Sequence, residues 1–224
     1  MIICACIPNV EIVISYLHKN CASEVKNNKG ADQMWVLILG LVLFLGIHLI
    51  SALPRKRHKL VRQLGENKFK LVYSAIALIG FVVIIIGYAL ARPTATVLYE
   101  PPFELRHLAM LLVLIAFLLL PAAKLSGNIR YWLRHPQITA VKLWAFAHLL
   151  VNGDLASVLL FGSFLAWGIF DRISLKKREK FGLVKTRNFK PKIMHDIYAV
   201  VIGVGLYAAF AFYLHGILFG QPLL

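Results

Sequence analysis

The alternation of apolar and polar stretches along the chain predicts six helical spans. We place them at Trp35–Leu53, Leu71–Ala91, Leu105–Leu120, Ile138–Val151, Leu155–Phe170 and His195–Phe219. Several of these runs approach the roughly 20 apolar residues that cross a bilayer. We therefore expect an all-α, polytopic helical membrane protein with about six transmembrane helices.

Two of the six spans are short, and a turn joins them. Ile138–Val151 covers about 21 Å at the rise of an α-helix, which is short for a helix that faces lipid. Asn152, Gly153 and Asp154 follow it, and these residue types favour turns over helices. Because irregular backbone at membrane depth is tolerated only inside protein, we expect neighbouring helices to shield this pair.

Composition supports the membrane class. Of the 224 residues, 59% are hydrophobic and 16% are charged, and the mean hydropathy is +0.73. A soluble domain is much less apolar than this. Folded as a soluble core, the chain would have to bury nearly all of its side chains and would keep little polar surface.

The distribution of the net charge of +15 along the chain indicates the topology. The segments 54–70, 122–136 and 171–192 carry seven, three and nine Lys or Arg residues, whereas the two segments between them carry two and none. The positive-inside rule places the basic segments in the cytoplasm and both ends of the chain outside. The sequence has no stripe of aromatic and basic side chains for single-stranded nucleic acid, so the bilayer is the expected partner.

The first 33 residues differ from the rest of the chain. They contain all three cysteines, Cys4, Cys6 and Cys21, which form neither a disulfide framework nor a zinc ligand set. The segment lacks the basic start and the cleavage site of a signal peptide, and Met34 directly precedes the first strong span. We expect residues 1–33 to be a poorly ordered or mis-assigned extension and residues 34–224 to form the membrane domain.

His48 and His148 are the deepest ionisable residues of the predicted spans. By helical rise they lie about 9 Å and about 15 Å from the cytoplasmic side. Intramembrane ionisable residues are costly and are often functional, and imidazole is a common haem ligand. The alternative is that each histidine forms a hydrogen bond to a neighbouring helix. His107, His195 and His215 lie near span ends, where a hydrated histidine is the simpler interpretation.

Arg134 and His135 begin the fourth span, directly before Pro136. The guanidinium of Arg134 could bind a carboxylate or phosphate in a bidentate fork, as a haem propionate would require. The alternative is an arginine that extends its charge to the membrane surface. Asn152 and Asp154 are expected to serve turn geometry, since both side chains bond nearby backbone.

Several motifs together resemble the NnrU family of membrane proteins. They are GIHLIS around His48, RHP followed by LWAFAHLLVNGD around His148, FDRISLKKR from Phe170, and HGILFGQPL at the carboxyl end. The resemblance covers about residues 34–224. The family is associated with nitrite and nitric oxide reduction in denitrifying bacteria and is related to 15-cis-zeta-carotene isomerase, a haem b membrane enzyme.

This resemblance implies a bacterial inner-membrane protein that holds haem b through His48 and His148, with Arg134 and His135 beside the cofactor. The implied chemistry is redox sensing or haem-dependent isomerisation of a lipid-like molecule. The isomerase has a cysteine three residues before its second histidine, whereas Ala145 stands here. Redox sensing is therefore favoured, and denitrification components are the implied partners.

Two other functions stay open. One is a non-catalytic membrane factor that assists denitrification enzymes, because the sequence contains no complete catalytic constellation. The other is an S-adenosylmethionine-dependent membrane methyltransferase, a class that the chain resembles in its Arg-His-Pro before a helical hairpin. In that class two adjacent glutamates follow an Arg-Ile pair, but Ser174, Leu175, Lys176 and Lys177 follow Arg172-Ile173 here.

Overall fold

The computed structural model describes residues 33–183 and 189–219, and every regular element within them is helical. The elements are the helix Gln33–Ala52, α2 (Pro54–Leu64), α3 (Glu66–Ala91), the 3-10 turn η1 (Arg92–Thr94), α4 (Leu105–Ala122), α5 (Asn128–Leu133), α6 (Pro136–Val151), α7 (Leu155–Lys180), α8 (Ile193–Ala209), the π-helical segment η2 (Phe210–Leu214) and α9 (His215–Phe219). The predicted all-helical class is confirmed for these residues. The expected extension 1–33 lies outside them, apart from Gln33.

Five helical stretches in the described part of the chain are long and apolar enough to cross a membrane. They are Gln33–Ala52, Glu66–Thr94, Leu105–Ala122, Leu155–Lys180 and Ile193–Ile217. The fourth predicted span corresponds to α6, which has 16 residues and is shorter than these five. The predicted count of six therefore depends on α6.

The polar segments between the predicted spans contain more helix than apolarity alone suggested. Pro54 ends the first span as expected but also occupies the first turn of α2, where its missing N–H costs nothing. α5 forms within the expected loop 122–136. α7 continues ten residues past Phe170 to Lys180, because Lys, Arg and Glu are good helix formers and cations near a helix C-terminus are favourable.

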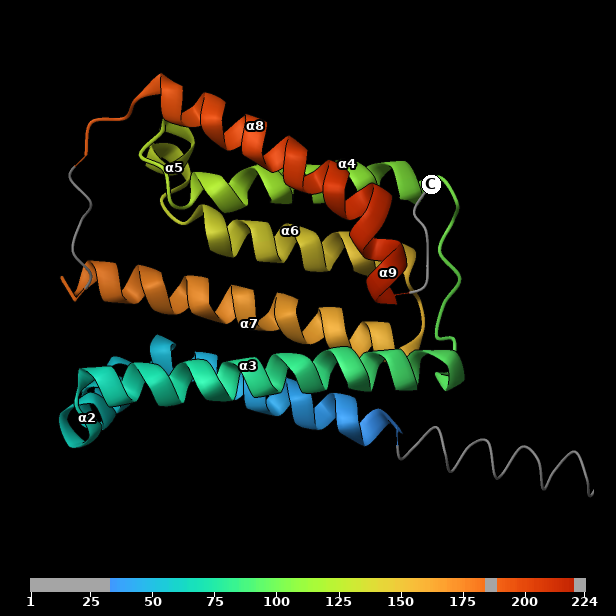
Figure 1. Ribbon diagram of the computed structural model, residues 1–224, viewed down its shortest axis with the longest axis horizontal. Coiled ribbons are helices and arrows are strands. Elements are labelled where there is room, and N and C mark those ends of the chain that lie inside the picture. The colour runs from blue at the N-terminus through green and yellow to red at the C-terminus, as the bar shows by residue number, and fades with distance from the viewer. Residues whose placement is uncertain (1–32, 184–188, 220–224) are drawn as a thin grey trace, which may run out of the picture.

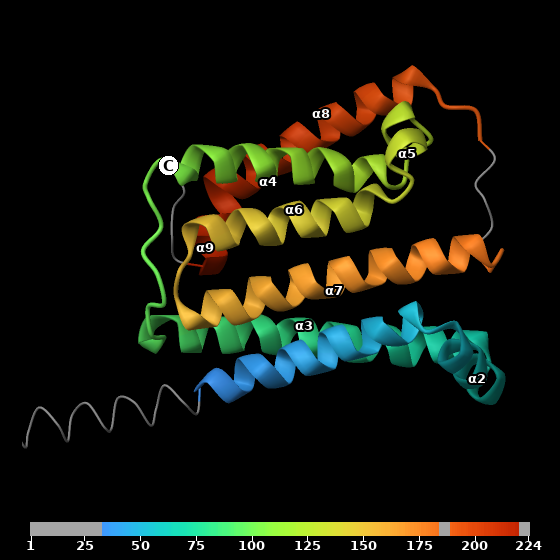
Figure 2. The same cartoon turned by 180° about the vertical axis from the view of Figure 1, so that it is seen from behind.

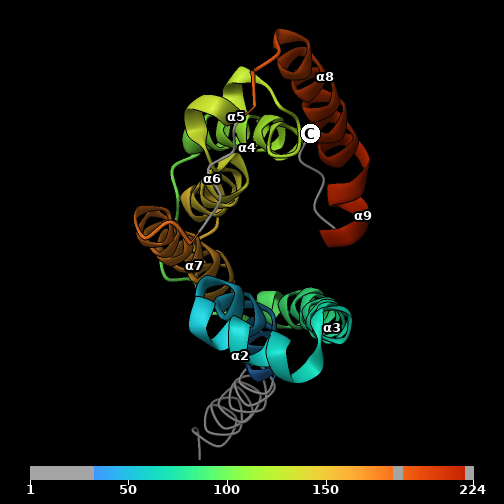
Figure 3. The same cartoon turned by 90° about the vertical axis from the view of Figure 1, so that its left-hand side faces the viewer.

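The long helices run side by side, and the end-on view shows them as one curved row (Figures 1 and 3). α6 packs between α4 and α7, and α4 also packs against α8. The helix Gln33–Ala52 and α3 lie beyond α7 at the other end of the row (Figure 2). As a result, α3 and the end of α8 face each other across the open side of the row (Figure 3).

Glycines allow two pairs of helices to touch at the backbone. A Cβ at Gly80 would lie 2.7 Å from the backbone nitrogen of Phe44, and one at Gly203 would lie 2.7 Å from the Cα of Leu118. Small residues at such crossings let membrane helices approach closely. These contacts fix α3 against the helix Gln33–Ala52, and α8 against α4.

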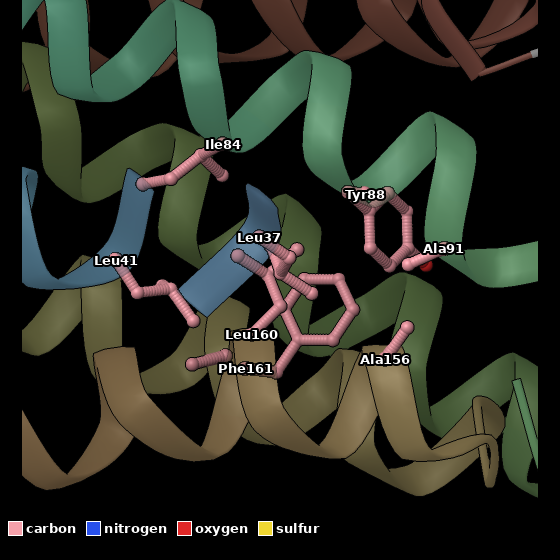
Figure 4. Packing of buried hydrophobic residues seen from close by; sticks show 9 residues of the cluster. Leu37, Leu41, Ile84, Tyr88, Ala91, Ala156, Leu160 and Phe161 are labelled. Carbon is pink, nitrogen blue, oxygen red and sulfur yellow. The ribbon is translucent and has the colours of Figure 1, made fainter. Parts of the chain in front are cut away.

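A cluster of nine buried residues joins four helices (Figure 4). Its members come from the helix Gln33–Ala52, α3, α6 and α7, and they are Leu37, Leu41, Ile84, Tyr88, Ala91, Ala145, Ala156, Leu160 and Phe161. Tyr88, Leu160 and Phe161 also line a cavity. The core thus supports one wall of that cavity.

Candidate functional site

A cavity of about 260 Å³ lies among α3, α4, α6, α7 and the C-terminal part of α8. Most of its wall is apolar and aromatic. Charged, imidazole and amide groups gather in its lining from elements that are distant in sequence: Arg92, Arg106, His148, Asn152 and His215. A mainly apolar cavity with a few convergent polar groups is the usual form of a small-molecule site.

His148 presents a free ring nitrogen in this cavity. Its Nδ1 lies 2.8 Å from the carbonyl oxygen of Trp144, one helical turn back. Because a carbonyl oxygen can only accept, Nδ1 carries the proton and Nε2 keeps a lone pair in the neutral ring. Within the described residues Nε2 has no hydrogen-bond partner. This is the tautomer of a metal-ligating histidine whose other nitrogen is held by the backbone.

Aromatic side chains fix the plane of the His148 ring. The ring stacks on Phe161 of α7 with centroids 4.5 Å apart, and the Trp144 indole lies 5.2 Å away.

No group of three or more His, Cys, Asp or Glu side chains that could hold a metal ion occurs in the ranges 33–183 and 189–219.

His215 lines the same cavity, although the sequence suggested no role for it beyond that of a histidine near a span end. It directly follows the π-helical segment η2, and Phe210 and Ala211 of that segment are also in the lining. A π-helix adds a residue to the turn and so changes the direction in which the following side chains point; such segments are rare and are frequent at functional sites. The irregular turn therefore helps to place a second imidazole beside His148.

Two arginines complete the polar part of the lining, and sequence reasoning did not assign them to the site. Arg92 follows α3; its Nη2 lies 3.4 Å from Oδ1 of Asn152, and its guanidinium lies over the Tyr88 ring at 5.9 Å. Arg106 comes from the start of α4. A signal was present in the sequence, because Arg92, Arg106 and His215 all lie at span ends on the side of the membrane where α6 ends.

A hydrogen-bond network holds the turn between α6 and α7 beside the cavity. Asp154 caps α7 by accepting from the backbone N–H of Ser157 at 2.9 Å, and it also accepts from the Ser157 hydroxyl at 2.6 Å. With its proton committed to the carboxylate, Ser157 accepts from the Tyr88 hydroxyl at 2.9 Å. Ser157 is fully buried. The network thus extends from Asp154 through Ser157 to Tyr88, which lines the cavity.

Tyr99 closes the same turn from the loop between α3 and α4. Its hydroxyl donates to the carbonyl oxygen of Asn152 at 3.0 Å and contacts that of Leu149. Burial, and then the neighbouring Asp154 carboxylate, raise the pKa of the Tyr99 hydroxyl. The hydroxyl therefore keeps the proton that it donates.

The structure places His48 away from this cavity. Its Nδ1 lies 2.6 Å from the carbonyl oxygen of Phe44, so its Nε2 also keeps a lone pair. The ring lies edge-on to Trp167 of α7 and to Tyr73 of α3, with centroids 5.8 and 5.5 Å away. His48 does not line the cavity that contains His148.

Arg134 and His135 lie where α5 meets α6, at the opposite end of α6 from His148. Nε2 of His135 lies 2.5 Å from Oε1 of Glu179 on α7. Arg134 has a φ of 60°, which is uncommon for a residue with a side chain and gives the chain its sharp direction change before Pro136. Neither residue lines the cavity.

Fold and site together define a polytopic helical membrane protein with a cavity between its helices that carries imidazole and guanidinium groups. The sequence model of the NnrU protein family matches residues 36–223, which is nearly the whole chain. The chain therefore belongs to the NnrU family. Searches of curated proteins and of solved structures give no significant match.

Proposed function

We propose that this NnrU-family protein is a membrane haem protein whose cavity holds haem b through His148. The observation that carries the proposal is the free ring nitrogen of His148 in a cavity lined by a second imidazole and two guanidinium groups. Imidazole is a common axial ligand of haem iron. His215 would be the second haem ligand in place of His48, because among the histidines that the structure describes only His215 lines the cavity with His148.

The polar side chains of the cavity suit haem, whereas the cavity itself is small for it. Arg92 and Arg106 would pair with the two propionate carboxylates, a role that the sequence alone suggested for Arg134. The volume of about 260 Å³ lies just below the ~300–1,000 Å³ that is usual for small-molecule sites. Side chains of the apolar wall must therefore move to admit the ring.

When bound, haem would supply one-electron redox chemistry that no side chain of the cavity provides. The protein's own contribution is to hold the imidazole tautomer through Trp144 and to neutralise the carboxylates. We favour redox sensing over isomerisation of a lipid-like substrate. Ala145, which replaces the isomerase cysteine, is fully buried and offers no ligand for exchange.

In the cell, the proposed role is redox sensing in support of nitrite and nitric oxide reduction, in the bacterial inner membrane. Six spans, with α6 as the short one, would place the basic segments 54–70, 122–136 and 171–192 on the cytoplasmic side. α6 can be short because α4 and α7 pack on both sides of it. Single cysteines introduced at Lys59, Lys180 and Glu100 test this arrangement. In a background with Cys4, Cys6 and Cys21 replaced by serine, membrane-impermeant thiol reagents applied to intact cells should label only the Glu100 position.

Optical spectroscopy of the purified protein tests the haem proposal. The full chain, expressed with ample haem and purified in mild detergent, should show a Soret band and a reduced-minus-oxidised difference spectrum. His148→Ala should abolish both, and His215→Ala should lower the haem content or change the spectrum. His107→Ala is the matched control and should keep wild-type spectra, because His107 lies on α4 outside the cavity lining.

The histidine variants also separate the two ligand assignments. Loss of haem in His48→Ala with retention in His215→Ala would restore the pair that the sequence suggested. A folded, monodisperse protein with no Soret band would contradict haem binding. A deletion strain with unchanged nitrite and nitric oxide consumption would contradict the cellular role and leave the haem site standing.

A further inference from the structure

α2 is a basic helix, and no ion pair in the part of the chain that the structure describes includes one of its charges. Its 11 residues, PRKRHKLVRQL, include five Lys or Arg and no Asp or Glu, and none of them is buried. Arg55, Lys59 and Arg62 stand at positions i, i+4 and i+7, so they form one line along the helix. Lys56 lies beside this line, and all four side chains are exposed. Together they form the outward face of α2.

The opposite face of α2 is turned toward α3. It carries Leu60, Val61 and Leu64, and the guanidinium of Arg57 lies over the ring of Phe69 on α3 at 5.8 Å. α2 packs on α3 through this side. Leu60 and Val61 are half-buried on this side, whereas Leu64 and the basic residues of the outward face are exposed.

The outward face is electrostatically unfavourable in isolation. The ion pairs of the described residues join Lys70 to Glu66, His135 to Glu179 and Arg178 to Asp171, and none of them includes α2. Like charges three and four residues apart destabilise a helix, and a helix this short is marginal in water. A surface of negative charge next to α2 would remove this penalty.

The position of α2 suggests which surface that is. α2 lies at the end of the helix row where α7 also ends (Figures 1 and 2). Five helical stretches of the described chain can cross a bilayer, so the ends of the row lie at the level of the lipid headgroups. Lys176, Lys177 and Lys180 of α7 are exposed at the same end.

We propose that the outward face of α2 is a binding site for the headgroups of anionic phospholipids. Clusters of four or more Lys and Arg next to a membrane helix bind anionic lipid surfaces, and an amphipathic helix lies naturally in the interface. The lysines of α7 raise the local potential, whereas the line of charges on α2 makes the direct contacts. This site is independent of the cavity and of haem.

Lipid binding to the full-length protein in detergent tests the site. Native mass spectrometry or a fluorescence titration would compare phosphatidylglycerol with phosphatidylcholine. The wild type should prefer phosphatidylglycerol, and the preference should weaken as salt increases. The variant Arg55→Gln/Lys59→Gln/Arg62→Gln should lose affinity on the order of 100-fold, from ~1 kcal/mol per basic residue at a lipid surface and ~1.4 kcal/mol per tenfold in affinity.

A matched variant separates a site on α2 from general attraction to the basic end. Lys176→Gln/Lys177→Gln/Lys180→Gln removes the same number of charges at that end and should change the affinity less than about 5-fold, because these charges act only through the local potential. Arg55→Lys/Arg62→Lys keeps the charge and should keep most of the binding, even if the glutamine variant proves unstable. Equal losses in the α2 and α7 variants, or no preference for phosphatidylglycerol in the wild type, would overturn the proposal.

Discussion

Replacement of Asp196 tests how the connection between α4 and α5 is held to α8. The Asp196 carboxylate accepts from the backbone N–H of Asn128 at 2.8 Å, from its side-chain amide at 2.7 Å and from the backbone N–H of Ile129 at 3.0 Å. Its exposed fraction is only 9%. Gly127 lies so close that a Cβ there would collide with the carboxylate. One side chain of α8 thus satisfies the first N–H groups of α5.

The structure sets the expected size of the effect. A hydrogen bond to a charged group contributes about 1.5–3 kcal/mol net. The bonds here share one carboxylate, and water can reach α5 once the carboxylate is gone, so the contributions do not add fully. We expect Asp196→Ala to lower the free energy of unfolding by about 3–5 kcal/mol. Asp196→Asn keeps one acceptor oxygen and should lose roughly half as much.

Unfolding by denaturing detergent, together with amide hydrogen exchange, measures both consequences. Asp196→Ala should shift the unfolding midpoint downward and reduce the protection of the Asn128 and Ile129 amides. Glu104→Ala is the matched control, because Glu104 is an exposed carboxylate with no side-chain capping bond. An unchanged midpoint with unchanged protection at Asn128 and Ile129 would refute the reasoning.

Three further substitutions test other parts of the structure. Gly80→Ala should separate α3 from the helix Gln33–Ala52 and lower the thermal midpoint, whereas Gly205→Ala should not, since no atom lies within 4 Å of a Cβ at Gly205; equal midpoints would count against backbone contact. Ser157→Ala removes the buried hydroxyl that accepts from Tyr88 and donates to Asp154 and should cost about 1–3 kcal/mol of stability, read from the same unfolding curves; a neutral result would show that the network contributes little. Arg106→Gln should weaken haem retention at least several-fold in a transfer assay to apomyoglobin, while Arg106→Lys should restore part of it; identical retention in all three proteins would remove Arg106 from the site.

Apolar run length predicted the helices well because lipid leaves the backbone no other partner. A segment at membrane depth must satisfy its N–H and C=O groups internally, so each apolar run becomes a helix. The same criterion missed helices in segments that are rich in charged residues. Residues 171–180 continue α7, and Pro54–Leu64 forms α2, although neither segment is apolar. Helix formation depends on propensity and capping as well as on hydropathy.

Hydropathy does not predict which side chains of different helices face the same cavity. Depth along a helix follows from counting residues, and it placed His48 and His148 at similar levels. Rotation about the helix axis does not follow, because these spans are apolar on nearly all sides and give no polar face to orient them. The cavity contains His148 and not His48 because α3, α4, α6, α7 and the C-terminal part of α8 line it, whereas the helix Gln33–Ala52 contributes no residue to the lining.

By itself the sequence determined the membrane class, the positions of most helices and the family motifs, since these depend on local composition and order. The tertiary structure decided that His148, His215, Arg92 and Arg106 share a cavity, that His48 lies outside it, and that Asp196 ties α5 to α8. These facts depend on which helices are neighbours and how each is rotated. Backbone contacts at Gly80 and Gly203, which join segments distant in the chain, fix which helices are neighbours, and the local π-helical turn before His215 changes the direction of the helix end that carries it.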